Sequence, residues 1–186
     1  MVRRDTPRTY DGIARSFHWL TALLVAILFG LGTYMTGLDY SDWKVRVFSW
    51  HAWIGLTVFS LTGLRLAWRL LHPPPPMPPS AWVEQIAALA THGILYFLMF
   101  AMPVVGFLGS NAFGFPVKWF GLVDLPDPIG RNETLGEALL LVHVVLAWIM
   151  AATLALHVGA ALFHHFVRRD PILGRMLPGA KPRRTD

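Results

Sequence analysis

Cysteine is absent from this sequence of 186 residues. Its absence excludes disulfides, thiolate nucleophiles, cysteine-held iron–sulfur clusters and covalently attached c-type haem. Charge is also scarce, because Asp, Glu, Lys and Arg make up only 15% of the residues, against about 25% in soluble proteins. Hydrophobic residues make up 54% and the mean hydropathy is +0.47, which excludes a disordered or collagen-like chain and disfavours a water-soluble enzyme. We interpret the chain as a small integral membrane protein.

Long runs without charged residues predict four membrane-spanning helices, since one span needs about 20 mostly apolar residues. These helices are expected at residues 15–38, 47–70, 84–108 and 135–168. The expected fold class is all-α, an integral membrane four-helix bundle, and residues 1–186 form one domain. The proline-rich segment from His72 to Ser80 should be an extended connector, because its prolines cannot continue a helix. Residues 109–134 should form the longest loop.

The basic residues are divided unevenly between the two ends of these spans. One side carries Arg3, Arg4, Arg8, Arg15, Arg65, Arg69, Arg168, Arg169, Arg175, Lys181, Arg183 and Arg184. The other side carries only Lys44, Arg46, Lys118 and Arg131. Because cytoplasmic loops are enriched in Lys and Arg, we expect both termini in the cytoplasm and the protein in the bacterial inner membrane. The basic residues behind the net charge of +5 flank the apolar spans rather than forming one patch, so no nucleic-acid partner is expected.

Histidines within the predicted spans are the candidate metal ligands. His143 and His157 are 14 residues apart in the fourth span, which places them on nearly one helix face and roughly 21 Å apart along the axis. One therefore lies toward each side of a hydrocarbon core about 30 Å thick. His51 begins the second span on the outer side, and His18 begins the first span on the inner side. Matching depths pair His18 with His157 and His51 with His143.

Two imidazoles facing each other at each depth predict two planar cofactors, each held between a pair. Haem b fits because it needs no cysteine, and two axial imidazoles leave its iron to carry electrons rather than bind gases. Small residues near the ligands leave room for a flat group, among them Gly55, Ala147, Ala151 and Ala155. Two other interpretations remain open: histidines that only hydrogen-bond between helices, and zinc, although pairs some 20 Å apart cannot complete one tetrahedral site.

Several short motifs along nearly the whole chain resemble the bacterial cytochrome b561 family, the four-span dihaem b cytochromes. The motifs are Ser16-Phe-His-Trp19, His51, Arg65-Leu-Ala-Trp-Arg69, His92-Gly-Ile-Leu-Tyr96, Ala101-Met-Pro-Val-Val-Gly106, His157, His164-His165-Phe166, Asp170 and Arg175-Met-Leu-Pro178. The resemblance implies that His18, His51, His143 and His157 are the axial ligands of two haem b groups. It also implies a superoxide oxidase that passes electrons from superoxide to ubiquinone, or an electron carrier with an unidentified donor.

The expected reaction places superoxide at the outer face and quinone at the inner end of the lipid-embedded bundle. Lys44, Arg46, Lys118 and Arg131 are expected to attract the superoxide anion, unless they only balance the outer acids. His164 follows His157 by seven residues on nearly the same face, and the resemblance places it beside the quinone, where it would relay a proton. The alternative for His164 is a histidine at headgroup level that faces lipid. The alternative function is a membrane-anchor cytochrome b that connects a dehydrogenase or hydrogenase with the quinone pool.

Overall fold

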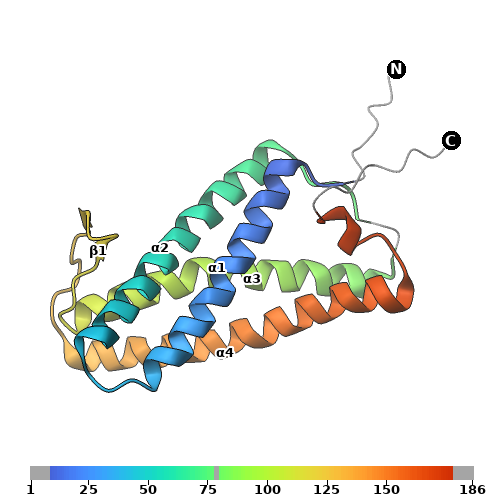
Figure 1. The fold of residues 1–186 in the computed structure, drawn as a ribbon. Helices are drawn as coiled ribbons and strands as arrows, with labels where there is room; N and C mark the ends of the chain where they lie inside the picture. The colour runs from blue at the N-terminus through green and yellow to red at the C-terminus, as the bar shows by residue number, and fades with distance from the viewer. Residues whose placement is uncertain (1–8, 78–79, 178–186) are drawn as a thin grey trace.

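The computed structural model describes residues 9–77 and 80–177, and four long helices make up most of it (Figure 1). They are α1 (Gly12–Thr36), α2 (Asp42–Leu71), α3 (Trp82–Ala112) and α4 (Glu133–Phe163). All four are long and apolar enough to cross a membrane. The expected all-α bundle with four spans is therefore confirmed.

Polar caps explain where three of the helices begin. The Asp11 carboxylate accepts from Ala14 N–H at 2.8 Å ahead of α1, and the Asn132 side chain accepts from Leu135 N–H ahead of α4. The Ser41 hydroxyl accepts from Lys44 N–H, so α2 begins at Asp42 rather than at the predicted residue 47. A capped first turn tolerates charged residues. The prediction began this span after Arg46 because it looked for a run without charged residues.

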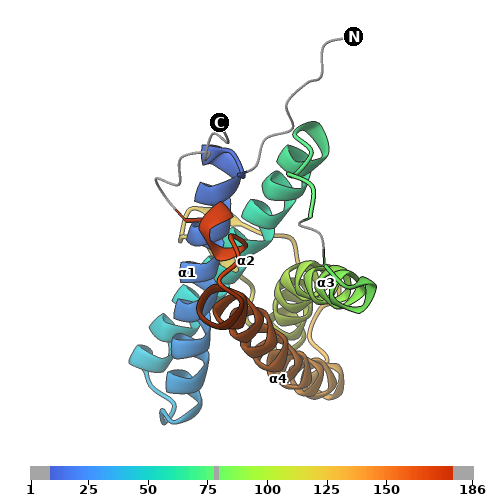
Figure 2. The same ribbon diagram turned by 90° about the vertical axis from the view of Figure 1, so that its right-hand side faces the viewer.

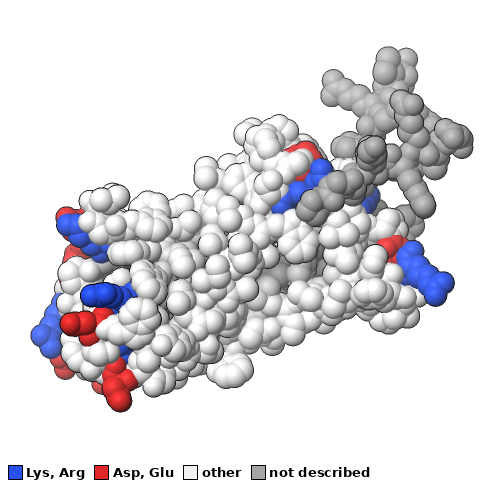
Figure 3. All heavy atoms as spheres, in the orientation of Figure 1, with Lys and Arg blue, Asp and Glu red and all other residues white. Residues whose placement is uncertain are grey.

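The helices form two antiparallel hairpins. Neighbouring helices α1 and α2 pack along each other, as do α3 and α4, and α2 also contacts α3 (Figure 2). We call the end that holds the starts of α1 and α3 the inner end, and the opposite end the outer end, following the predicted orientation. In the space-filling view, Lys, Arg, Asp and Glu gather at these two ends and leave the middle of the drawn face free of charge (Figure 3).

A buried apolar layer lies halfway along the bundle. Each helix contributes to it, with Val25, Val58, Leu98 and Met150. Met150 lies midway between His143 and His157 in the sequence. In the helices that carry paired histidines, the buried residue is seven positions from its histidine, or about 10.5 Å along the axis. This layer therefore separates the inner histidines from the outer ones.

The outer end is closed by a small hairpin inside the predicted long loop. Strands β1 (Lys118–Trp119) and β2 (Val123–Asp124) pair antiparallel, and Phe120 and Gly121 turn the chain with positive φ angles of 50° and 69°. The hairpin docks on α2, because the Trp53 indole donates to Lys118 O at 2.7 Å. The sequence predicted only a loop here.

The inner end is closed by the chain that follows α4. Arg15 donates to Leu177 O at 2.9 Å and the Trp19 indole donates to Met176 O at 2.8 Å. Arg175 donates to Pro76 O in the connector, whose residues 73–77 have no regular secondary structure, as its prolines require. Of the predicted inner cations, Arg3, Arg4, Arg8, Lys181, Arg183 and Arg184 lie outside the described residues.

Candidate functional site

Four histidines from three helices meet as two pairs. The ring centres of His18 in α1 and His157 in α4 are 6.3 Å apart. Those of His51 in α2 and His143 in α4 are 6.2 Å apart. Helix α4 thus contributes one imidazole to each pair, and the structure brings together the partners that the depth argument expects.

The spacing within each pair matches two imidazoles that share one metal ion. A bond of about 2.0–2.1 Å between metal and ring nitrogen, added to about 1.1 Å from that nitrogen to the ring centre, puts two opposed ring centres about 6.3 Å apart. Across residues 9–77 and 80–177, no group of three or more His, Asp or Glu side chains could hold a metal ion. The pairs therefore suit a metal whose other ligands come from a cofactor, as in haem, better than zinc.

Two glycines, which we call the seat glycines, lie directly against the imidazoles of the outer pair. A Cβ on Gly32 of α1 would lie 3.4 Å from Cε1 of His51, and one on Gly106 of α3 would lie 3.2 Å from Cε1 of His143. An added Cβ at Gly106 would require the His143 ring to shift by a few tenths of an ångström, whereas one at Gly32 would only just reach ordinary van der Waals contact with His51. The absence of two side chains thus fixes how closely each imidazole approaches its neighbouring helix.

The same close approach aims one nitrogen of each outer imidazole at a helix backbone. The Nδ1 atoms of His51 and His143 are buried and make no hydrogen bond of standard geometry. They face the backbone at Leu28 and Met102, each one turn before its glycine. A metal-bound histidine usually donates its second N–H to such a carbonyl. Together with the open space at Gly55, where an added Cβ would meet no atom within 4 Å, these contacts fit a planar, metal-bearing cofactor.

The inner pair has charged and aromatic neighbours instead. A guanidinium nitrogen of Arg65 lies 3.2 Å from Nδ1 of His18, and the ring centre of His92 lies 5.3 Å from that of His157. From the sequence, neither Arg65 nor His92 was expected to lie next to a cofactor. Their depth could be read from the sequence, since His92 lies near the inner end of α3, but which way they face depends on how each helix is rotated against its partner in the hairpin. Two residues of the inner site were therefore missed.

Three of the four predicted outer cations already have partners. Lys44 donates to Leu38 O at 2.6 Å, Lys118 lies 3.4 Å from the Asp124 carboxylate, and Arg131 lies 2.6 Å from the Glu133 carboxylate. Arg46 is exposed, and no described residue forms an ion pair or hydrogen bond with its side chain. Arg46 and Lys44, whose partner is a neutral carbonyl, are therefore the two cations of this set without a carboxylate beside them among the described residues.

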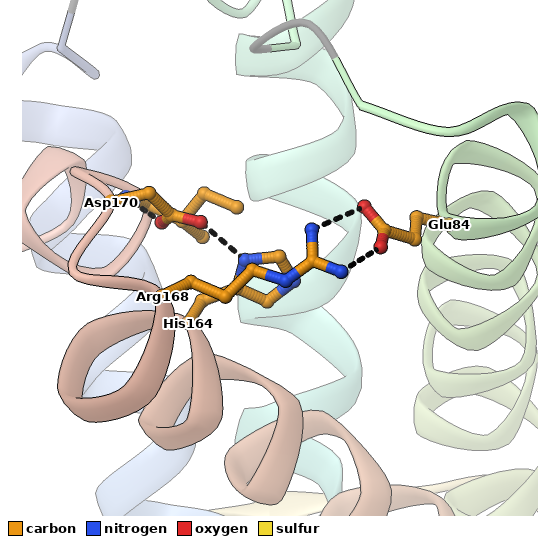
Figure 4. Close-up of polar contacts among 5 residues, drawn as sticks. Glu84, His164, Arg168 and Asp170 are labelled. Atoms are coloured by element: carbon orange, nitrogen blue, oxygen red, sulfur yellow. Dashed lines mark hydrogen bonds and ion pairs between the residues drawn. The ribbon is translucent and has the colours of Figure 1, made fainter.

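His164 stands at the inner end of α4, where the helix widens into a π-helical turn (His164–Arg168). Its Nδ1 pairs with the Asp170 carboxylate, and Arg168 beside it pairs with Glu84 of α3 at 2.6 Å (Figure 4). Partial burial alone would raise the pKa of Asp170, but hydrogen bonds from His164 and from the Ile172 N–H hold it below its ordinary value. His164 is half-buried rather than turned fully toward the surface.

The two remaining histidines lie away from both pairs. His72 is exposed in the connector, as expected, and its ring stacks on the Trp68 indole with centres 3.8 Å apart. His165 is exposed beside Phe166 on the other side of the turn from His164. Neither histidine belongs to the candidate site.

Comparisons with known proteins point to one family. A family model described as prokaryotic cytochrome b561 matches residues 9–179. Cytochrome b561 homolog 2 of Escherichia coli strain K12 is 36% identical over 175 residues, which cover 93% of each protein. The probable superoxide oxidase CybB of Yersinia pestis is 30% identical over 176 residues, which cover 92% of this chain and 97% of that protein. Cytochrome b561 homolog 1 of Escherichia coli is 29% identical over 88% of this chain.

Proposed function

Because the chain belongs to the prokaryotic cytochrome b561 family of membrane electron carriers, which bind b-type haem, we propose that it is a superoxide oxidase. It oxidises superoxide at the outer face and reduces ubiquinone at the inner end. In balance, two superoxide ions become two O2, and one quinone takes up two electrons and two protons to become quinol. The name of the 30% identical relative supports the choice of substrate.

Two haem b groups are the proposed cofactors, one between His18 and His157 and one between His51 and His143. The observation that carries this assignment is the separation of 6.3 and 6.2 Å between the paired ring centres. Haem b held by these histidines would supply one-electron transfer rather than gas binding. The buried layer around Met150 keeps the two pairs apart and excludes water from the space between them.

The outer residues attract the substrate in this proposal. Superoxide is an anion, and uncompensated positive charge raises the rate at which an anion reaches a site. Arg46 and Lys44 carry the main part of this effect, because Lys44 binds only the neutral carbonyl of Leu38, whereas Lys118 and Arg131 already face carboxylates. The orientation that puts this end outside follows from the excess of Lys and Arg at the inner end.

The inner residues supply protons to the quinone. The Asp170 carboxylate fixes the His164 ring through Nδ1, so Nε2 is the nitrogen left to give a proton to the quinone and take another from water. The ion pair of Arg168 with Glu84 holds the end of α4 against the start of α3 beside this histidine. Quinone and the lipid bilayer are thus the proposed inner partners.

The direct test is stopped-flow absorption spectroscopy of the purified protein mixed with superoxide, with and without a ubiquinone analogue. We expect reduction of a b-type absorption band, followed by its reoxidation only when quinone is present. Reduction no faster than the background would reject the superoxide oxidase. It would favour instead the membrane-anchor cytochrome b, which should copurify with a dehydrogenase or hydrogenase. A colourless protein would reject any haem-based function.

A further inference from the structure

Two arginines one helical turn apart at the inner end of α2 share a single aromatic ring. The guanidinium carbons of Arg65 and Arg69 lie 5.4 and 5.9 Å from the ring centre of Tyr96 in α3. Like charges spaced four residues apart on a helix repel each other, and the ring offsets only part of this repulsion. Arg65 is also half-buried within the span, where a charge needs a counter-ion.

No carboxylate in the described ranges supplies that counter-ion. Three acidic residues lie at the inner end of this part of the chain, and each has other partners. Asp11 caps α1 and accepts from the Trp68 indole. Glu84 pairs with Arg168, and Asp170 pairs with His164. Within residues 9–77 and 80–177, the two guanidinium groups therefore have no carboxylate partner.

The contact of Arg65 with His18 points to the cofactor as the source of the missing anion. The guanidinium is 3.2 Å from Nδ1 of His18. When a neutral imidazole binds iron through one nitrogen, its proton sits on the other. Nδ1 then becomes a donor and faces the guanidinium, which has only donors. The Tyr96 side chain remains as a hydrogen-bond partner of Arg65, but it is neutral and supplies no counter-ion. The propionates of haem are the carboxylates that arrive together with the iron.

We propose that Arg65 and Arg69 form an anion-binding site for the two propionate carboxylates of the haem b held between His18 and His157. Two guanidinium groups match two carboxylates in charge, and the planar fork of Arg binds a carboxylate through two hydrogen bonds. Tyr96 supports both groups from the side of α3. This inference rests on the proposed function, because it requires a haem at the inner pair.

Haem dissociation from the purified full-length holoprotein tests the site. In lipid-free detergent, transfer of haem b to apomyoglobin should be about tenfold faster from Arg65→Gln than from the wild type, and Arg65→Lys should recover part of the loss. Haem b dimethyl ester, which has no free carboxylates, should leave the wild type and Arg65→Gln at the same rate. Arg168→Gln is the matched control, because Arg168 is an inner guanidinium that already has Glu84 as its partner.

A redox titration adds a second readout. Removing a positive charge near iron disfavours the reduced state, so Arg65→Gln should lower the midpoint potential of one haem by about 59 mV, which is tenfold for one electron. Arg168→Gln should leave both potentials near the wild-type values. The same titration of Arg69→Gln, at an exposed residue, decides the matter should Arg65→Gln fail to fold.

Three results would overturn the site. One is equal acceleration of haem b and ester loss by Arg65→Gln. Another is an Arg168→Gln protein that behaves like Arg65→Gln. The third is an Arg65→Gln effect seen only in anionic vesicles, which would assign the arginines to lipid phosphate. A wild type that holds fewer than two haems would overturn the proposed histidine pairs, whereas two haems with unchanged Arg65→Gln rates and potentials would overturn this inference alone.

Discussion

The outer and inner histidine pairs have nearly the same ring spacing but different surroundings. At the outer pair, glycines at 32 and 106 bring each imidazole against a helix backbone, and no Lys, Arg, Asp or Glu of the described residues acts on either ring. At the inner pair, the neighbours are the Arg65 guanidinium and a third imidazole, His92. Close packing against glycines thus surrounds the outer pair, whereas a charged side chain contacts the inner pair. Changes of volume should therefore affect the outer pair most, and changes of charge the inner pair.

Loss of a paired histidine is the largest expected effect and tests whether there are two separate pairs. His143→Ala and His157→Ala should each lose one of two haems, because one imidazole remains at the affected pair and both remain at the other. The haem-to-protein ratio from pyridine haemochrome spectra measures this. Full haem content in His143→Ala would contradict the outer pair.

Adding a methyl group at a seat glycine tests whether shape holds the outer pair. Gly106→Ala should destabilise the holoprotein by about 1–3 kcal/mol through overpacking and change the low-spin haem signal in electron paramagnetic resonance. Gly32→Ala should act in the same direction but less, because its Cβ contact is longer. Thermal unfolding and the resonance spectrum are the measurements.

Gly30→Ala is the control for this experiment. Gly30 lies on the same helix as Gly32, and a Cβ there would meet nothing within 4 Å. Alanine should leave the haem spectrum unchanged and keep or raise stability, by up to about 1 kcal/mol from helix propensity. If Gly30→Ala and Gly32→Ala altered the spectrum equally, the close contact of Gly32 with the His51 ring would have no special role.

Neutralising Asp170 tests the charged character of the inner end. Asp170→Asn should cost about 1 kcal/mol of unfolding free energy at neutral pH, because it removes charge-assisted hydrogen bonds to His164 and Ile172 N–H. The native pKa of Asp170 is below its ordinary value, so its contribution is complete above the unfolded pKa of about 3.9 and disappears as pH falls through the native pKa. Denaturant unfolding at several pH values should show the two proteins converging only in acid.

Neutralising Arg46 has the smallest expected effect. Arg46→Gln should slow haem reduction by superoxide on the order of a few-fold and weaken its dependence on salt, since steering is long-range and screened. Lys118→Gln is the comparison, because Lys118 already faces the Asp124 carboxylate. An unchanged rate and salt dependence in Arg46→Gln would remove this residue from the outer site.

The depth of each histidine could be predicted from the sequence, because a regular helix converts residue number into height and facing. For this reason, the spacing of His143 and His157 on one helix carried the prediction of two levels. The apolar layer follows the same rule, since Met150 lies midway between them.

Other contacts between helices could not be predicted in this way, because they depend on how each helix is rotated about its axis, and spans that are apolar on nearly all sides do not show which side faces a neighbour. The approach of Arg65 to His18 joins α2 with α1, and that of His92 to His157 joins α3 with α4, so each lies within one hairpin. The seat glycines were missed for the same reason, although glycines one turn after Leu28 and Met102 were visible in the sequence. The hairpin on Trp53 depends on single hydrogen bonds between loop and helix, which leave no periodic pattern.

The contacts of residues 175–177 with the start of α1 have a consequence for biogenesis. Arg15 and Trp19 bind carbonyls of Leu177 and Met176, which leave the ribosome after all four helices. The contacts that close the inner end therefore cannot form during membrane insertion, and they form as the last step of maturation. Loading of prosthetic groups at this end has its natural interval before that step, and a tag fused directly after Leu177 would interfere with assembly rather than with turnover.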